Sequence, residues 1–491
     1  MQKILVANRG EIACRIIKTI KKMGLKSIAI FSEIDRDAPH VLAADQSVCI
    51  GKNPSSESYL KGDKIIEIAL KLNADGIHPG YGFLSENAEF AQKVTDSGLI
   101  FIGPSPHSIR IMGSKLAAKE CVKQFDIPMV PGIDTAIVNV QEALQKAKVI
   151  GYPILIKASA GGGGKGMRLV ENEAEFESQL KRAISEATAS FGDGSVFLER
   201  YISSPRHIEI QILADNHGNC VHLFERECSI QRRHQKVIEE APSSILNDEI
   251  REKMGNAAVM VAKSCNYSGA GTVEFLVDEG LNFYFLEMNT RLQVEHPVTE
   301  YITGLDLVEE QIKIAQNKTL SFTQNELKIQ GHSIELRIYA EDPQNDFNPS
   351  IGQLLEYEEP QIQDVRVDSG FRKNMEIPIY YDPMIAKLIV HANNRMAAIA
   401  KMKEAITNFK IKGIETTLPF GQFVMNHEAF ISGNFNTHFV EKNFNSEAIQ
   451  KSRYQTRKYA SLLALKIHQN ESQKTISAEN NETNWSPKNR Q

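Results

Sequence analysis

Residues 285–296 alternate polar and apolar side chains, and this pattern predicts an extended strand. Alternate side chains of a strand point to opposite faces, so we expect one polar face above an apolar core. The polar positions are Glu287, Asn289, Arg291, Gln293 and Glu295. An ordinary amphipathic strand with a solvated face would show the same alternation, so the pattern alone leaves both interpretations open.

A second strand is predicted at residues 271–277, and Asp-Glu-Gly-Leu-Asn at 278–282 predicts the turn between the two. The resulting hairpin would place Glu274 opposite Glu287, with their side chains roughly 5 Å apart on one face. Two facing carboxylates repel each other unless a proton or a cation lies between them. With Asn289 they form an all-oxygen ligand set, which suits Mg²⁺ or Mn²⁺ better than zinc.

Length and charge exclude several classes of protein. A chain of 491 residues is too long for one core and should form about three domains. Its net charge of −5 argues against a nucleic-acid binder, and no apolar run has the length of a membrane span. The six cysteines include no CxxC pair, and the chain enters a strand at its first residues. We therefore expect reduced thiols and a cytoplasmic location.

Residues 1–112 alternate short apolar runs with amphipathic helical segments, which predicts a doubly wound α/β domain. The first apolar run, at residues 3–7, is not followed by GxGxxG, so we expect no NAD site. His78-Pro-Gly-Tyr-Gly82 forms a turn at the carboxyl end of a strand, where such sheets build sites. A plain tight turn is the alternative.

A glycine-rich run, Ala158-Ser-Ala-Gly-Gly-Gly-Gly-Lys-Gly166, lies between two predicted strands at 153–157 and 167–170. A dinucleotide-binding motif would need a helix next, and a Walker A motif would need Ser or Thr after Lys165. The remaining interpretations are a flexible linker or a hairpin whose backbone N–H groups close over phosphates, with Lys157 and Lys165 on either side.

Two further segments carry charge within strand-like patterns. Residues 225–236 are dense in Arg, His and Lys, and form either a solvated loop or the wall of a pocket. Residues 331–342 alternate again, with Arg337 on the same face as Glu335 and Tyr339. A β-rich domain then extends to about residue 445, and we interpret the polar segment 447–491 as largely disordered apart from a helix at 459–467.

Five motifs together resemble biotin carboxylase, the ATP-grasp component of biotin-dependent carboxylases. They are Ala7-Asn-Arg-Gly-Glu-Ile-Ala13, His78-Pro-Gly-Tyr-Gly-Phe-Leu-Ser-Glu-Asn87, Lys157-Ala-Ser-Ala-Gly-Gly-Gly-Gly-Lys-Gly166, Gln231-Arg-Arg-His-Gln-Lys236 and Glu287-Met-Asn-Thr-Arg-Leu-Gln-Val-Glu-His-Pro297. The resemblance implies a doubly wound N-terminal domain over 1–112 and an ATP-grasp domain over 113–330, with a glycine-rich lid at about 131–203. A β-rich C-terminal domain over 331–446 and the tail at 447–491 complete the α/β and α+β fold.

The resemblance also implies the reaction, in which ATP, bicarbonate and biotin on a separate carrier give ADP, phosphate and N-carboxybiotin. Glu274, Glu287 and Asn289 would hold Mg²⁺ or Mn²⁺. Bicarbonate would bind Lys236, Arg291, Gln293 and Val294, with Glu295 as its general base. Arg337 would stabilise the biotin enolate, and Arg291 beside Glu295 would keep that carboxylate ionised. The residues implied around ATP are Lys115, Lys157, Gly163, Gly164, Glu199, Arg200, Ile202, His207, Gln231 and His234.

By the same resemblance the chain needs a biotin carboxyl carrier and a carboxyltransferase on other chains, and it should form a homodimer. A carrier domain shows Met-Lys-Met in a hairpin turn, whereas Lys401-Met-Lys403 lies in a helical pattern here. Residues 381–387, Tyr-Asp-Pro-Met-Ile-Ala-Lys, resemble the α-subunits of methylcrotonyl- or propionyl-CoA carboxylases. The alternatives are another ATP-grasp ligase that forms carboxyphosphate, such as a carbamoyl-phosphate-synthetase-like enzyme, and a non-catalytic subunit.

Overall fold

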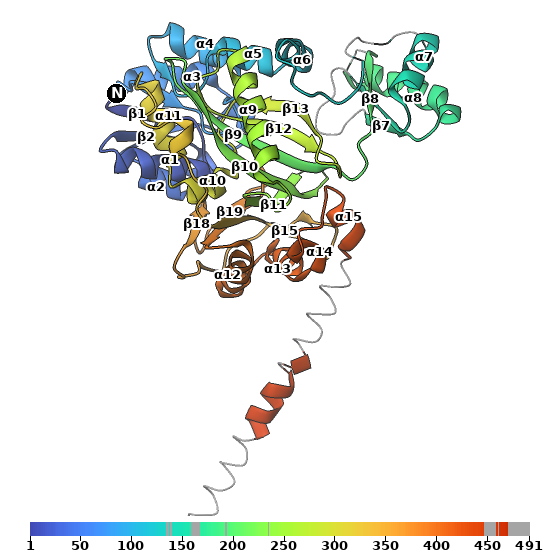
Figure 1. Ribbon diagram of the computed structural model, residues 1–491. Helices are drawn as coiled ribbons and strands as arrows, with labels where there is room; N and C mark the ends of the chain where they lie inside the picture. The colour runs from blue at the N-terminus through green and yellow to red at the C-terminus, as the bar shows by residue number, and fades with distance from the viewer. Residues whose placement is uncertain are drawn as a thin grey trace, which may run out of the picture.

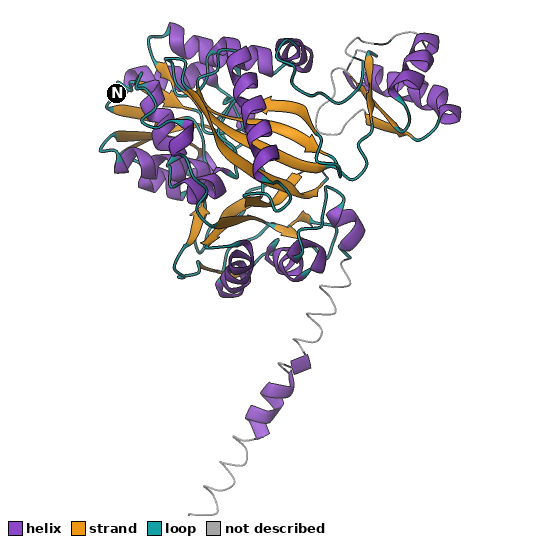
Figure 2. Cartoon of the chain, viewed as in Figure 1, coloured by secondary structure: helices purple, strands orange, loops and turns teal. Residues whose placement is uncertain are grey.

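The computed structural model describes residues 1–133, 137, 140–158, 167–191, 194–233, 235–445, 458–459 and 461–469. Within these ranges the side chains of Lys115, Leu116, Val140 and Phe191 lie outside the description. The main body holds two large sheets with helices on their outer faces, and a smaller unit stands to its right in Figure 1. Figure 2 shows how helices cover the sheets at the top and the bottom of this body.

The N-terminal part is a parallel sheet of order β3-β2-β1-β4-β5, as the sequence predicts for a doubly wound domain. Ile4, Leu5 and Val6 of its first strand are apolar and buried because helices cover both faces of a parallel sheet. Its elements are β1 Lys3–Val6, α1 Gly10–Lys22, β2 Lys26–Ser32, α2 Pro39–Ala43, β3 Gln46–Gly51, α3 Gly62–Lys71, β4 Gly76–His78, α4 Ala88–Asp96, β5 Ile100–Phe101 and α5 Pro106–Met112.

The smaller unit is a three-stranded antiparallel sheet of order β7-β6-β8 with α7 and α8 against it. The predicted pairing of the strands on either side of the glycine-rich run is confirmed, because Lys157 pairs with Met167 across β6 and β7. The run itself, residues 159–166, lies outside the described residues. The elements of this unit are α7 Val140–Ile150, β6 Ile154–Ala158, β7 Met167–Val170, α8 Glu173–Phe191 and β8 Val196–Arg200. The helix α6 Lys115–Lys123 precedes the unit in the chain and packs against α5, α9 Asp248–Ser264 and β13 Phe283–Asn289 of the main body. Ser114 caps α6, because its side-chain oxygen accepts from Ala117 N.

The central sheet has eight strands in the order β13-β12-β9-β10-β11-β14-β19-β18. It runs without interruption across the boundary expected near residue 330, because β11 pairs antiparallel with β14. Its strands are β9 Arg206–Ala214, β10 Cys220–Arg232, β11 Gln235–Ala241, β12 Gly269–Val277, β13 Phe283–Asn289, β14 His332–Tyr339, β18 Val365–Ser369 and β19 Met384–Ala392. Side chains from distant parts of the sequence therefore lie on neighbouring strands of one sheet.

Helices and short strands complete the body. Those around the central sheet are α9 Asp248–Ser264, α10 His296–Thr303 and α11 Leu307–Ala315. The C-terminal part adds β15 Glu341–Asp342, β16 Asn348–Pro349, β17 Glu356–Glu358, α12 Arg395–Asn408, β20 Lys410–Lys412, α13 Leu418–Asn426, α14 Glu428–Ile431 and α15 Phe439–Asn443. No helix among the described residues is long and apolar enough to span a membrane.

The expected helix near residues 459–467 is present at 458–459 and 461–469 and points away from the body in Figure 1. Residues 446–457, 460 and 470–491 lie outside the described residues, so the predicted disorder of the tail stays a prediction. Met402 is fully buried in α12, which confirms that Lys401-Met-Lys403 belongs to a helix and not to a hairpin turn.

Candidate active site

One cleft of about 1940 Å³ gathers most of the predicted site residues. Its volume exceeds the roughly 300–1,000 Å³ of a typical single-ligand pocket, so it has room for more than one substrate. Of the predicted residues, its lining includes Lys157, Glu199, Arg200, Ile202, His207, Gln231, Lys236, Glu274, Glu287, Asn289, Arg291, Gln293, Val294 and Arg337. Gly163, Gly164, His234 and the side chain of Lys115 lie outside the described residues.

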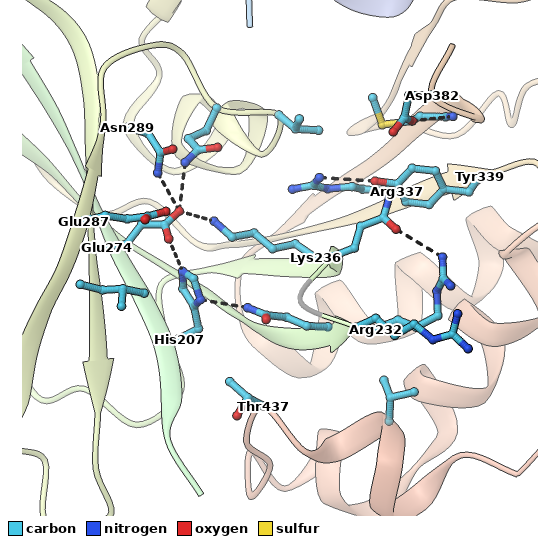
Figure 3. A pocket seen from close by; sticks show the side chains of 18 of the residues that line it. His207, Arg232, Lys236, Glu274, Glu287, Asn289, Arg337, Tyr339, Asp382 and Thr437 are labelled. Carbon is cyan, nitrogen blue, oxygen red and sulfur yellow. Dashed lines mark hydrogen bonds and ion pairs between the residues drawn. The ribbon is translucent and has the colours of Figure 1, made fainter. Parts of the chain in front are cut away.

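The predicted hairpin is confirmed, and the register of β12 and β13 places Glu274 directly opposite Glu287. Asn289 ends β13 and donates from Nδ2 to Glu274 Oε1 at 2.9 Å. Figure 3 shows the three side chains together at one wall of the cleft. Two carboxylates and an amide oxygen in this arrangement fit Mg²⁺ or Mn²⁺, because both ions prefer oxygen ligands.

The prediction of a strand through residue 296 is wrong. The strand ends at Asn289, residues 290–295 form a turn, and α10 begins at His296 with Pro297 in its first turn. Proline has no N–H for a strand ladder and suits the first turn of a helix, so the extended segment must stop before it. The turn still delivers Arg291, Gln293 and Val294 to the cleft, although not by strand alternation.

The ammonium group of Lys236 on β11 contacts three carboxylates. Its Nζ lies 2.8 Å from Glu274 Oε1, 2.8 Å from Glu295 Oε1 and 2.5 Å from Glu209 Oε2. Burial acts to lower the pKa of Lys236, but Glu209, Glu274 and Glu295 outweigh burial and hold its pKa well above the usual value. Lys236 therefore remains charged, and Figure 3 shows it extending across the cleft toward Glu274.

Glu295 lies behind the cleft wall with no exposed surface, between two cations. Arg337 Nη2 donates to its Oε2 at 2.9 Å, while Lys236 holds its Oε1. Burial acts to raise the pKa of Glu295, but Lys236, Arg337 and Arg226 together keep it well below the usual range. Glu295 is consequently a carboxylate at neutral pH.

The prediction that Arg291 keeps Glu295 ionised stays a prediction: Glu295 acts to raise the pKa of Arg291, but the main cations that lower the pKa of Glu295 are Lys236, Arg337 and Arg226. Arg291 Nε donates to Glu86 Oε2 at 2.8 Å, and its Nη1 donates to Gln293 Oε1 at 3.1 Å. The turn at residues 290–295 sends the Arg291 guanidinium toward Glu86, whereas Glu295 at the start of α10 points toward Lys236 and Arg337. Arg291 still borders the cleft, but the cations that contact Glu295 come from β11 and β14.

Near the smaller sheet, Glu199 accepts from two lysines. Lys119 Nζ lies 2.6 Å from its Oε1, and Lys157 contacts its Oε2. Burial acts to raise the pKa of Glu199, but Lys157 and Lys119 lower it below the usual value. Apolar side chains provide a surface for a flat ring beside these charges, and they are Leu155, Met167, Ile202, Leu276 and Leu286.

His207 and Gln231 form a chain of contacts that ends at Glu274. Gln231 Nε2 contacts His207 Nδ1 at 2.9 Å, and His207 Nε2 lies 3.0 Å from Glu274 Oε2. His207 is on β9 and Gln231 on β10, which pair antiparallel. Residues 225–236 are therefore not a solvated loop where the structure describes them. Residues 225–230 are buried in β10, and the cleft is lined by Gln231, Arg232, Arg233, Gln235 and Lys236.

Sequence reasoning missed four residues that support this site, of which Glu209, Arg226 and Glu239 are buried and Lys119 is partly exposed. Arg226 Nε contacts Glu209 Oε1 at 2.5 Å, and neither side chain exposes any surface. Glu239 accepts from Arg337 Nε at 2.6 Å, and Lys119 contacts Glu199 as described above. The alternation at 206–213 places Glu209 on the same face as His207, which was the available signal. Arg226, Glu239 and Lys119 gave no comparable signal, because their partners are distant in sequence.

Comparison with known proteins places the chain in a family. Family models match it in three consecutive segments: "Biotin carboxylase, N-terminal domain" at 1–109, "Carbamoyl-phosphate synthase L chain, ATP binding domain" at 114–323, and "Biotin carboxylase C-terminal domain" at 335–442. A biotin carboxylase of Nostoc sp. is 52% identical over 440 residues, which cover 90% of this chain and 98% of that protein. The chain belongs to the biotin carboxylase family. The predicted resemblance, fold class and enzyme class, an ATP-dependent ligase, are thereby confirmed.

Two further similarities define how far this membership extends. A crystal structure of biotin carboxylase from Campylobacter jejuni aligns with a TM-score of 0.86 and 48% identity, covering 90% of this chain and 99% of that one. The mitochondrial propionyl-CoA carboxylase alpha chain of Sus scrofa is 52% identical over 89% of this chain, which spans only 60% of that protein's length. The similarity therefore covers whole biotin carboxylases but only part of the longer alpha chains.

Proposed function

We propose that this chain carboxylates biotin held on a separate carrier, as the first half-reaction of an acetyl-CoA or acyl-CoA carboxylase. Bicarbonate attacks the γ-phosphate of ATP and releases ADP, which gives carboxyphosphate. Carboxyphosphate breaks into CO₂ and phosphate, the released phosphate takes the proton of a ureido nitrogen of biotin, and that nitrogen then attacks the CO₂. The observation that carries this proposal is the ionised, fully buried Glu295, which lies just behind the cleft wall between Lys236 and Arg337.

Glu295 is proposed as the general base that removes the proton of bicarbonate. A carboxylate held by two cations is a weak base, since its pKa lies well below the usual range. Bicarbonate bound beside Lys236 and Arg291 would accept some of the N–H donors that now point at carboxylates. Sharing these donors raises the pKa of Glu295 in the complex, so substrate binding itself makes Glu295 a stronger base.

Arg337 is proposed to stabilise the negative oxygen of the biotin enolate. Its guanidinium is buried, permanently charged and fixed on β14 by Glu239 at 2.6 Å and Glu295 at 2.9 Å. A cation that is already in position needs no reorganisation when charge develops on the oxygen, and this is how electrostatic preorganisation lowers a barrier. Lys236 lies on the adjacent strand, so the two positive groups face one reaction space.

ATP is proposed to lie between the smaller sheet and the central sheet, with its ring against the apolar side chains and its phosphates toward Lys157. The residues proposed around it are Lys115, Lys157, Gly163, Gly164, Glu199, Arg200, Ile202, His207, Gln231 and His234. Mg²⁺ held by Glu274, Glu287 and Asn289 would neutralise charge on the transferring phosphoryl group. A related carboxylase domain from Hydrogenobacter thermophilus, 48% identical, is described in complex with MgADP and bicarbonate, which supports this assignment.

A second candidate function is a ligase that also forms carboxyphosphate but transfers it elsewhere. It is favoured by the match of residues 114–323 to the ATP-binding domain of carbamoyl-phosphate synthase. Against it, Arg337 lies in the segment that matches the biotin carboxylase C-terminal domain, and its guanidinium reaches the same cleft. A non-catalytic subunit is less well supported, since every proposed catalytic side chain among the described residues is present.

The partners are proposed from a comparison with longer relatives, of which this chain covers only a part. The chain spans about 60% of the propionyl-CoA carboxylase alpha chains that it matches, and Met402 is buried inside α12. We therefore place the biotin carrier and the carboxyltransferase on other polypeptides or on a further segment.

A homodimer is proposed because the Hydrogenobacter thermophilus relative is described as a domain dimer. The six free thiols support a cytoplasmic location.

We propose domain boundaries at residues 112, 330 and 446. The central sheet crosses the second boundary through the pairing of β11 with β14, so the ATP-grasp and C-terminal domains are proposed as one cooperative unit.

The test is ADP release from the purified chain with MgATP, bicarbonate and free biotin, leaving out each component in turn. We expect turnover that needs bicarbonate and rises with biotin. Turnover that needs bicarbonate but ignores both biotin and a biotinylated carrier would instead establish the second candidate. Turnover without bicarbonate, or no turnover with the carrier present, would contradict both.

A further inference from the structure

Lys387 is a lysine with no exposed surface, and the proposed chemistry does not use it. It lies in the middle of β19, within the segment 381–387 that resembles carboxylase α-subunits. Its Nζ donates to the backbone carbonyl oxygen of Val294 at 2.8 Å. Val294 lies in the turn at residues 290–295, which also carries Arg291, Gln293 and Glu295. Lys387 therefore connects β19 to this turn.

The burial of an ammonium group is costly unless other groups compensate its charge. Two carboxylates do so, with Glu11 Oε2 at 3.4 Å and Asp368 Oδ2 at 3.7 Å from Nζ. Neither is as close as the Val294 carbonyl. The acidic residues therefore stabilise the charge, while the shortest contact of the ammonium is directed at the backbone of the turn.

The Val294 carbonyl needs such a donor because of its place between two elements. The strand β13 ends at Asn289 and α10 begins only at His296. The neighbouring carbonyls are used locally, since Gln293 O accepts from His296 N at 3.3 Å and Glu295 O accepts from Val298 N at 3.3 Å. A backbone carbonyl beside a buried core is costly to leave unpaired, and the partner that the structure shows for Val294 is Lys387.

We propose that Lys387 is a positioning residue for bicarbonate activation, acting through the Val294 carbonyl to fix the turn at residues 290–295. The inference rests on the proposed function, because it assigns a purpose to the geometry of the same site. With the turn fixed, Gln293 and Val294 face the cleft and Glu295 stays within reach of Lys236 and Arg337. The effect falls mainly on bicarbonate, since Lys157 and Glu199, which are proposed to contact ATP, belong to other elements. The turn reaches the metal end of the cleft through Gln293 Nε2, which donates to Glu274 Oε1 at 3.2 Å, and through Arg291 Nη2, which donates to Asn289 Oδ1 at 3.3 Å.

The test is Lys387→Met, which keeps the length of the side chain and removes both the charge and the donor. We expect kcat/KM for bicarbonate to fall about 100-fold, the effect of moving a catalytic group by about 1 Å, with the Kd of MgATP within about 3-fold of wild type. We also expect faster backbone hydrogen exchange in peptides covering residues 290–298. The exchange measurement requires no turnover.

The matched control is Arg395→Met. Arg395 is likewise a largely buried cation that donates to backbone carbonyls, those of Phe430 at 2.7 Å and Ile431 at 2.8 Å, and it pairs with Glu240 at 2.7 Å. Its loss should destabilise the chain without changing the bicarbonate KM or the exchange at 290–298. If Lys387→Met does not fold, the double variant Glu11→Gln/Lys387→Met removes a buried negative charge together with the positive one and is measured instead.

The outcomes separate this inference from the proposed function. Unchanged bicarbonate kinetics and unchanged exchange in the Lys387 variants would overturn the inference, as would the same changes in Arg395→Met. The wild-type chain could show no bicarbonate-dependent turnover while Lys387→Met still raises exchange at 290–298. In that case the proposed function fails, and with it the role of Lys387 in bicarbonate activation. The structural part, that Lys387 anchors the turn, would still hold.

Discussion

Lys236 and Glu295 meet at 2.8 Å although they are 59 residues apart, one on β11 and the other at the start of α10. The same ammonium also holds Glu209 and Glu274, so a single lysine balances three buried carboxylates. Glu274 belongs to the proposed metal site and Glu295 is the proposed base. Lys236 therefore contacts both a proposed metal ligand, at the nucleotide end of the cleft, and the proposed base, at the bicarbonate end.

The first prediction concerns Glu295→Gln, which keeps the shape of the side chain and removes its basicity. Bicarbonate-dependent ADP release should fall by about 10²- to 10⁴-fold, the usual contribution of a general base. Lys236 keeps two other carboxylate partners, so the fold should survive, and thermal unfolding checks this. Glu240→Gln is the matched control, since Glu240 is equally buried but pairs with His332 and Arg395 away from the cleft. Near-wild-type turnover in Glu295→Gln would rule out its role as base.

The second prediction concerns the metal. Glu287→Gln removes one of two facing carboxylates, and affinity for a hard divalent cation depends on the number of charged ligands. We expect the Mg²⁺ concentration for half-maximal ADP release to rise by about tenfold or more. Glu279→Gln, in the exposed turn between β12 and β13, should leave it unchanged. An identical Mg²⁺ dependence in both variants would exclude Glu287 as a ligand.

The third prediction is a pH dependence of stability at Glu11. Burial raises the pKa of Glu11 to about 7, although Lys387 acts to lower it. The folded chain then binds more protons than the unfolded chain between pH 4.5 and 7, so this residue lowers stability as pH rises through that window. Relative to wild type, Glu11→Gln should gain roughly 2–3 kcal/mol of unfolding free energy between pH 5 and pH 8. Denaturant unfolding of both chains at the two pH values measures the difference, and a constant difference would refute the shift.

The fourth prediction tests the contact between the N-terminal and C-terminal parts. A Cβ on Gly370 would lie 2.6 Å from the backbone nitrogen of Glu11 and 2.9 Å from Gly10, and neither atom can move as a side chain can. Gly370→Ala should therefore cost about 1–3 kcal/mol of stability. Gly280→Ala is the control, because its Cβ would meet only the side chains of Asn282 and Asp278 at 3.2 and 3.3 Å. Equal unfolding midpoints for the two variants would contradict the expected clash.

Local patterns predicted those parts of the site that are formed by neighbours in sequence. Alternation together with a five-residue turn predicted the hairpin, but an unbroken register from that turn would place Glu274 opposite Leu286. A register shift between Glu274 and Phe275 brings Glu274 opposite Glu287. The same alternation failed beyond Asn289, where Pro297 starts a helix and ends the strand pattern. The proline was visible in the sequence, so this error came from giving periodicity more weight than a helix-start signal.

Contacts between distant segments could not be predicted from pattern. The partners of Lys236 come from β9, β12 and the start of α10, and their approach depends on the order of strands in the central sheet. The pairing of Arg291 with Glu86 likewise joins residues 205 positions apart. Periodicity gives the face on which a side chain lies but not the strand that will lie beside it, so Arg226 and Glu239 were missed, and the face that Glu209 shares with His207 did not reveal its partners.

The unbroken central sheet has a consequence for any attempt to shorten this protein. A fragment ending near residue 323, where the match to the ATP-binding domain stops, would lose β14 and expose the edge of β11 from Ile238 to Ala241. An open edge with unpaired N–H and C=O groups is a template for pairing with another chain. Such a fragment would thus present Lys236 on an aggregation-prone border, and the smallest piece that can hold the site must extend past β19.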